Sequence, residues 1–236
     1  MHDIVKTVAL AILSVTPLVL GPYYQRDLQE RISLELDGLE PRQVLGQLAR
    51  ILDREMSFEV KANQPILISA KDITVRTALD AMGDLIGCHW SIVDGKIVIK
   101  ELASGEASAL ANRSKPIHDD IQNRLPSPMR FESVPLNFVL ESIFKQASVR
   151  YCHLGYSASY RKSVTADVSN AKVEDALARA MRSAGVMTFK MVRTIDETPA
   201  TWLVIVPPAE RERHRNRSRR GSDNDYLAAP FYMSRS

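Results

Sequence analysis

The stretch LDGLEPRQVLGQLA, residues 36–49, recurs in altered form as FESVPLNFVLESIF, residues 131–144. In each stretch an acidic residue, a small residue, an apolar residue and a proline precede a Val-Leu pair. A second pair of stretches follows in the same order, VRTALDAMGDLIG at residues 75–87 and VEDALARAMRSAG at residues 173–185. The intervals from Val to Leu and from Leu to Gly are equal in both. Two such blocks in the same order predict that one folding unit occurs twice in the chain.

The hydrophobic pattern around these blocks gives the order of elements. Apolar residues alternate before Pro41 and then follow at helical spacing, so a strand and an amphipathic helix are expected there. A second helix with the same spacing ends at Gly87, where a left-handed cap is typical. The Asp94-Gly95 pair between alternating apolar residues predicts a hairpin. Both copies therefore predict an α+β fold of two tandem β-α-β-β-α-β-β modules.

The composition divides the chain into five parts. The modules are expected at residues 31–101 and 129–208, each as its own folding unit, and residues 102–128 form an Ala-, Ser-, Asn- and Pro-rich linker with a short helix. Residues 8–20 are uncharged and mostly apolar, which indicates that residues 1–21 are a signal peptide or an N-terminal membrane anchor. Residues 209–236 are expected to be a disordered, Arg-rich tail.

The motifs resemble a known family. Leu36-x-x-Leu39-Glu-Pro-x-x-Val44-Leu45, then Val75-x-x-Ala78-Leu79, then Gly87-x-x-Trp90 and Asp94-Gly-Lys-Ile97 are similar to the secretin and TonB N-terminus short domain (STN) family. The second module resembles a more divergent member. The resemblance implies two helices packed between a two-stranded and a three-stranded sheet. It also implies a periplasmic protein of Gram-negative bacteria that docks onto partners of a secretin, secretion or TonB-linked signalling system.

We searched the sequence for catalytic and metal-binding patterns. It contains no P-loop, no G-x-G-x-x-G, no H-E-x-x-H, no C-x-x-C and no G-x-S-x-G. The chain is therefore not expected to be an enzyme, and no cofactor, metal or small-molecule substrate is expected. Cys88 and Cys152 leave three alternatives: two separate core thiols, which we favour, one disulfide, or a zinc site with His89 and His153.

Candidate contact residues lie in three places. A strand around Phe58 and Glu59 lies outside the hairpin and is expected at a sheet edge, where it could pair with a strand of another envelope protein or of a second copy. Tyrosines at interfaces anchor partners, which makes Tyr156 and Tyr160 candidates in a loop. The tail residues that could contact an anionic membrane or cell-wall surface are Arg215, Arg217, Arg219 and Arg220.

The charge distribution helps to rank the function classes. Residues 210–220 carry a net charge of +4 while the whole chain carries +3, so the modules are close to neutral. The favoured hypothesis is a non-catalytic, periplasmic interaction or assembly module, tethered to the inner membrane if the signal is retained. The alternative is a nucleic-acid-binding α/β protein with a basic tail. Nucleic acid is disfavoured, because neither module contains the G-x-x-G clamp of KH-like proteins.

Overall fold

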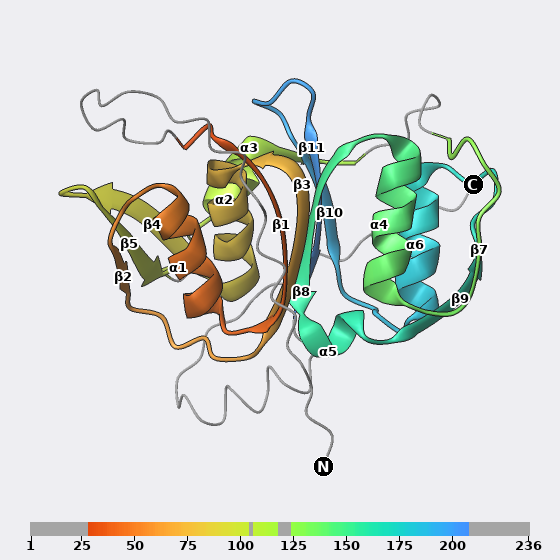
Figure 1. Ribbon diagram of the computed structural model, residues 1–236, viewed down its shortest axis with the longest axis horizontal. Coiled ribbons are helices and arrows are strands. Elements are labelled where there is room, and N and C mark those ends of the chain that lie inside the picture. Colours follow the sequence, from red (N-terminus) through yellow and green to blue (C-terminus); the bar gives the residue numbers. More distant parts are fainter. Residues whose placement is uncertain (1–27, 104–105, 118–123, 208–236) are drawn as a thin grey trace, which may run out of the picture.

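The computed structural model describes residues 28–103, 106–117 and 124–207 and shows a mixed α+β protein, which confirms the predicted fold class (Figure 1). The predicted signal or anchor at residues 1–21 and the predicted tail at 209–236 lie outside the described residues. No helix in the described part of the chain is both long and apolar enough to cross a membrane.

The first predicted module contains seven elements in the expected order. They are β1 (Arg31–Leu39), α1 (Pro41–Ile51), β2 (Met56–Phe58), β3 (Ile66–Thr74), α2 (Val75–Ile86), β4 (Cys88–Val93) and β5 (Lys96–Glu101). The second predicted module has the same order with one short helix inserted. Its elements are β7 (Arg130–Pro135), α4 (Leu136–Ala147), β8 (Arg150–Tyr156), α5 (Ser157–Tyr160), β9 (Ser163–Asp167), α6 (Val173–Ser183), β10 (Lys190–Thr194) and β11 (Thr201–Val206).

Local sequence explains where several elements begin and end. Pro41 occupies the first turn of α1, where its missing N–H costs nothing, and Glu40 and Gln43 form a capping box. The Thr74 hydroxyl accepts a hydrogen bond from the Thr77 N–H at the start of α2. Gly87 ends α2 with φ 68° and ψ 48°, the left-handed conformation that glycine adopts without strain.

The strands of the two modules pair in the same way. In the first module β1 pairs with β3 antiparallel, while β5 lies between β2, which is parallel to it, and β4, which is antiparallel. In the second module β7 pairs with β9, and β11 lies between parallel β8 and antiparallel β10. Each module thus contributes one two-stranded and one three-stranded arrangement.

The two modules are joined edge to edge. Strand β3 of the first pairs antiparallel with β8 of the second, from Ile66 opposite Tyr156 to Lys71 opposite Tyr151. The linker supplies α3 (Ala109–Arg113) and β6 (Ser114–Pro116), and β6 pairs with β10. The result is one six-stranded sheet in the order β1-β3-β8-β11-β10-β6. The predicted linker therefore forms part of the fold rather than a spacer.

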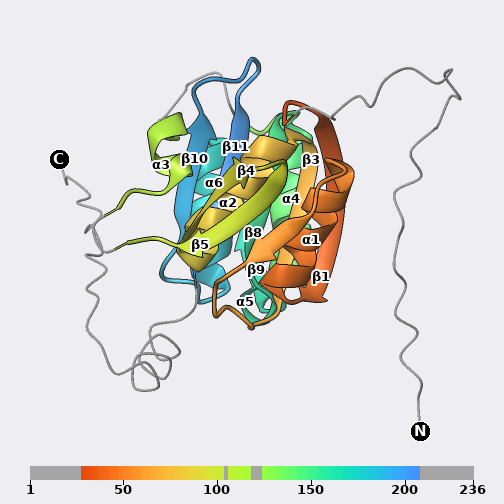
Figure 2. The ribbon, with the colours of Figure 1, turned by 90° about the vertical axis from the view of Figure 1, so that its left-hand side faces the viewer.

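The elements stack in five layers, which Figure 1 shows from left to right and Figure 2 shows from the left-hand side. The sheet β2-β5-β4 comes first, then α1 and α2, the six-stranded sheet, α4 and α6, and finally β7 and β9. Every residue of β11 is buried. Leu203 and Ile205 pack into the core around α1 and α2, whereas Trp202 and Val204 pack into the core around α4 and α6.

Because the two modules share this sheet, we expect each to depend on the other for folding rather than to fold separately. Leu203 belongs to the second module but is fully buried in the core of the first. In a Trp202→Phe chain Trp90 is the sole tryptophan and reports on the first module. Adding Leu203→Ala should lower the free energy of unfolding that Trp90 fluorescence reports in urea by about 2–5 kcal/mol. A Trp90 transition that does not move would mean that the modules unfold independently.

Candidate functional site

The three-stranded sheets of the two modules differ in what covers their edges. In the second module, β8 is paired with β3 and β10 is paired with β6. In the first module, the sheet ends at β2 on one side and at β4 on the other, and the described residues supply no further strand. An unpaired edge exposes main-chain donors and acceptors to a partner strand. These two edges are the candidate functional site.

The main chain of β2 shows which groups are available. The Ile97 N–H donates to the Glu55 carbonyl (2.8 Å) and the Glu59 N–H donates to the Ile99 carbonyl (3.0 Å), so residues 55 and 59 face β5. Main-chain groups of a strand alternate in direction along its length. The N–H and C=O groups of Met56 and Phe58 therefore point away from β5, toward the open edge.

A shallow hollow of about 270 Å³ adjoins this edge. It is formed where the first turn of α1 approaches the segment after β2. Its lining mixes acidic, basic and apolar side chains: Glu40, Arg42, Phe58, Val60, Lys61, Ala62 and Asn63. The edge of β2 is thus flanked by a concave surface that could receive side chains of a bound strand.

The structure places the predicted contact residues as follows. Phe58 lies half-buried on β2 and Glu59 is exposed directly after it, so these two lie together at an edge. The Glu59 carboxylate lies 3.9 Å from the Lys100 amine. Because its N–H bonds to β5, a proline at Glu59 would damage the sheet of the module itself, and Glu59 is the wrong position to test edge pairing. Tyr156 is half-buried at the end of β8.

Tyr160 does not form an exposed anchor, contrary to the interpretation of a tyrosine-bearing loop. Its side chain is fully buried. It ends the short helix α5, which follows β8 directly, and its ring packs against His153 with centroids 5.3 Å apart. Gly155 makes room for this ring, since a Cβ there would lie 2.9 Å from Cε2 of Tyr160 and 2.5 Å from the Val206 carbonyl. A loop prediction could not show that α5 turns this side chain inward.

The predicted tail contacts, the two cysteines and the possible metal site stand as follows. Arg215, Arg217, Arg219 and Arg220 lie outside the described residues. Cys88 and Cys152 are buried free thiols, and burial raises the pKa of each to about 12. Within residues 28–103, 106–117 and 124–207, no group of three or more His, Cys, Asp and Glu side chains could hold a metal ion.

His153, which the sequence offered only as a possible zinc ligand, lies buried at the joint between the modules. His153 on β8 is fully buried, stacks with Phe144 and Tyr151, and has no hydrogen-bond partner for either ring nitrogen among the described residues. Its Nε2 lies 3.9 Å from Oε1 of Glu141, which also accepts a bond from the Ser69 hydroxyl of β3 (3.0 Å). Burial lowers the pKa of His153 to about 3. The ring is therefore a neutral part of the core.

This lowered pKa predicts a pH dependence of stability. The folded chain binds the His153 proton less readily than the unfolded chain, whose ordinary histidine pKa is about 6.5. The contribution of neutral His153 to the free energy of unfolding is therefore fully present above about pH 6.5. Acidification toward pH 3 should lower the free energy of unfolding by up to about 1.4 kcal/mol per pH unit. His153→Phe should make the slope of unfolding free energy against pH shallower over this range, as urea titrations at several pH values would measure. Equal slopes in the two proteins would contradict the assignment.

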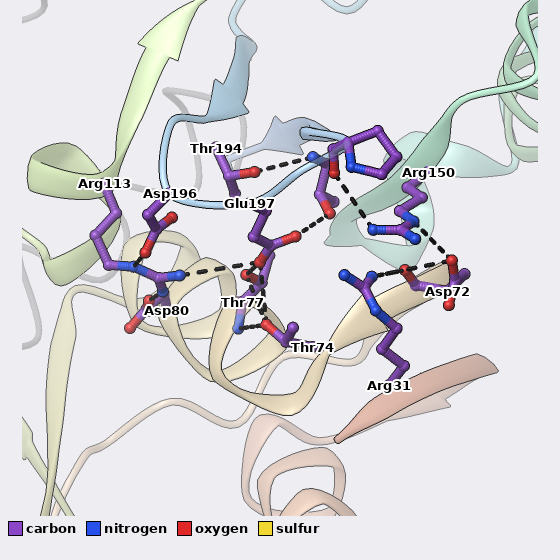
Figure 3. A network of polar contacts seen from close by, with 12 residues as sticks. Arg31, Asp72, Thr74, Thr77, Asp80, Arg113, Arg150, Thr194, Asp196 and Glu197 are labelled. Carbon is purple, nitrogen blue, oxygen red and sulfur yellow. Dashed lines mark hydrogen bonds and ion pairs between the residues drawn. The ribbon is translucent and has the colours of Figure 1, made fainter. Parts of the chain in front are cut away.

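A polar network holds the linker against both modules (Figure 3). Arg113 of α3 pairs with Asp80 of α2, with Asp196 (2.6 Å) and with Glu197 (3.9 Å) in the loop between β10 and β11. Burial raises the pKa of Asp80, against the opposing effects of the bonds from Trp90 and Arg113. The Glu197 carboxylate accepts hydrogen bonds from the three hydroxyls of Thr74, Thr77 and Thr201.

Arg113 neutralises carboxylates that water does not reach, so its loss should be costly. The Asp80 side chain is 1% exposed and the Glu197 side chain 4%. Arg113→Met should lower the free energy of unfolding by about 3–5 kcal/mol, because it leaves buried charges unpaired. Arg130→Met is the matched control: its pair with Asp167 is exposed, at 82% and 49%, so water screens it and its loss should change the free energy of unfolding far less. Equal losses for both variants in urea unfolding would argue against a buried network.

Comparisons with known proteins gave no further identification: no family model, no curated protein and no solved structure matches this chain.

Proposed function

We propose that this chain is a non-catalytic, periplasmic interaction protein that binds an extended segment of an envelope partner along the open edge of β2. The observation that carries the proposal is the pairing of β3 with β8. Strand β8 occupies in the second module the place that β2 occupies in the first, since each lies parallel to the middle strand of its sheet. An edge of this kind therefore accepts an antiparallel strand from outside its module.

The surroundings of β2 support this use of the edge. The outward N–H and C=O groups of Met56 and Phe58 provide main-chain bonds, which give affinity without sequence preference. The hollow beside them provides the side-chain contacts that give specificity. It contains both a carboxylate, Glu40, and two cations, Arg42 and Lys61, so a partner segment carrying charges of both signs fits it best.

The periplasmic location and the link to a secretion, secretin or TonB-linked signalling system rest on the sequence. The uncharged apolar residues 8–20 support export. The resemblance of the motifs to the STN family supports a partner in the cell envelope.

Met56 provides the sharpest test of edge pairing. Its N–H points outward, so Met56→Pro removes a donor from the open edge without removing a bond to β5. Met56→Ala is the matched control, because it loses the half-buried side chain but keeps the N–H. Recovery of the partner from envelope extracts with tagged full-length chain should be about tenfold lower for Met56→Pro than for Met56→Ala, given about 1 kcal/mol for a lost hydrogen bond plus the clash of the ring.

Two controls complete this experiment. Ser57→Pro should destabilise the fold itself, because residue 57 faces β5. Cell fractionation of the same strains checks the location, and a chain found in the cytosol would contradict export. Equal partner recovery by Met56→Pro and Met56→Ala would show that β2 is not the docking edge.

A further inference from the structure

The opposite edge of the same sheet, β4, also has main-chain groups that no described strand pairs with. Val93 and Lys96 flank the two-residue turn Asp94-Gly95, and at the other end the Leu102 N–H donates to the Gly87 carbonyl (3.0 Å). Residues 87, 89, 91 and 93 therefore exchange hydrogen bonds with β5. The N–H and C=O groups of Cys88, Trp90 and Ile92 point away from β5, toward the edge.

This edge lacks the usual protection against strand pairing. Its sequence, CHWSIV, contains no Asp, Glu, Lys or Arg. Natural edge strands are commonly protected by charged side chains. The edge strand β1 shows this protection, since Arg31, Glu35 and Asp37 lie along it. In contrast, β4 exposes Ile92 (38%) and Val93 (50%).

The second module shows that the corresponding edge accepts an antiparallel strand. Strand β10 lies antiparallel to the middle strand of its sheet, as β4 does. Its outer edge is paired antiparallel with β6, from Val192 opposite Pro116 to Thr194 opposite Ser114. Strand β4 lacks such a partner among the described residues.

The residues of β4 are compatible with pairing between two copies. When two antiparallel β4 strands are centred on Ser91, Ser91 lies opposite Ser91 of the second copy. Trp90 then lies opposite Ile92, an aromatic and β-branched pair of the kind that stabilises sheets, and His89 lies opposite Val93. No like charges are opposed. Centring β1 on its middle residue would instead place Glu35 opposite Glu35, which is unfavourable.

We propose that two copies of this chain form a two-fold symmetric dimer through antiparallel pairing of β4 about Ser91. The first-module sheets then become one continuous six-stranded sheet in the order β2-β5-β4-β4-β5-β2. The interface is isologous, as in most soluble dimers. Because it uses the edge opposite β2, the dimer leaves two β2 edges free, and it can exist whether or not β2 binds a partner.

Charge substitution at Ser91 tests the register as well as the association. Ser91 lies on the outer face of the sheet, away from the buried Ile97 and Ile99. In sedimentation experiments on the full-length chain, the unmodified protein should be dimeric. Ser91→Lys alone and Ser91→Asp alone should each shift the dimer dissociation constant upward at least tenfold, because like charges face each other across the axis. An equimolar mixture of the two variants should regain the dimer.

A cysteine at the same position gives an independent measurement. Facing residues of a non-hydrogen-bonded pair have Cα atoms about 4.5 Å apart, which suits a disulfide. Ser91→Cys should form a covalent dimer on mild oxidation, whereas Lys100→Cys on β5, which is exposed, should not. Monomeric unmodified protein at the highest soluble concentration, or equal cross-linking from both positions, would overturn the proposal. Loss of partner binding by Met56→Pro with an unchanged dimer would support each proposal separately.

Discussion

The antiparallel pairing of β3 with β8 is the interaction on which the rest of the structure depends. It merges a two-stranded and a three-stranded sheet, and the merged sheet must then be covered on both faces. The sequence of the second module is adapted to this requirement. Its middle strand β11 is TWLVIV and is buried on both faces, whereas the middle strand β5 of the first module is KIVIKE and alternates between buried and exposed residues. A continuous apolar run is what burial on both faces demands.

The elements were predictable because each depends on residues close in sequence. The capping of α1, the left-handed Gly87 and the Asp94-Gly95 turn are all local. The joint between the modules was not predicted, because main-chain pairing between β3 and β8 leaves no side-chain motif. The largely apolar run at residues 201–206 was the sequence feature that could have indicated this joint. At the site, Phe58 was correctly placed at an edge, but the inward N–H of Glu59 depends on register against Ile97 and Ile99. The network of Arg113 joins residues far apart in sequence and had no local signal.

Among the described residues, the same joint is not repeated at either end of the stack of layers. Strand β9 corresponds to β3 in its pairing, but the Ser183 hydroxyl accepts from the Thr165 N–H and donates to the Thr165 carbonyl, both at 2.9 Å. An incoming strand would have to displace Ser183. At the other end, Glu55 and Lys96 form an exposed ion pair on the sheet β2-β5-β4. The corresponding face of the three-stranded sheet in the second module is apolar and covered. A third module could not be added there without burying these charges, which would be costly.

These differences assign different roles to the two modules. The second module uses the edges of its three-stranded sheet for pairing within the chain, while the corresponding edges of the first module, β2 and β4, have no partner strand among the described residues and are the ones we propose for binding other molecules. Helix α2, which packs against β4, is itself held from both ends. Thr74 and Thr77 at its first turn bind Glu197, and Asp84 near its end binds Lys190 (2.8 Å), so the second module fixes it in place. An edge that is already rigid loses little entropy on association, so in the function we propose the second module would contribute to binding without touching the partner.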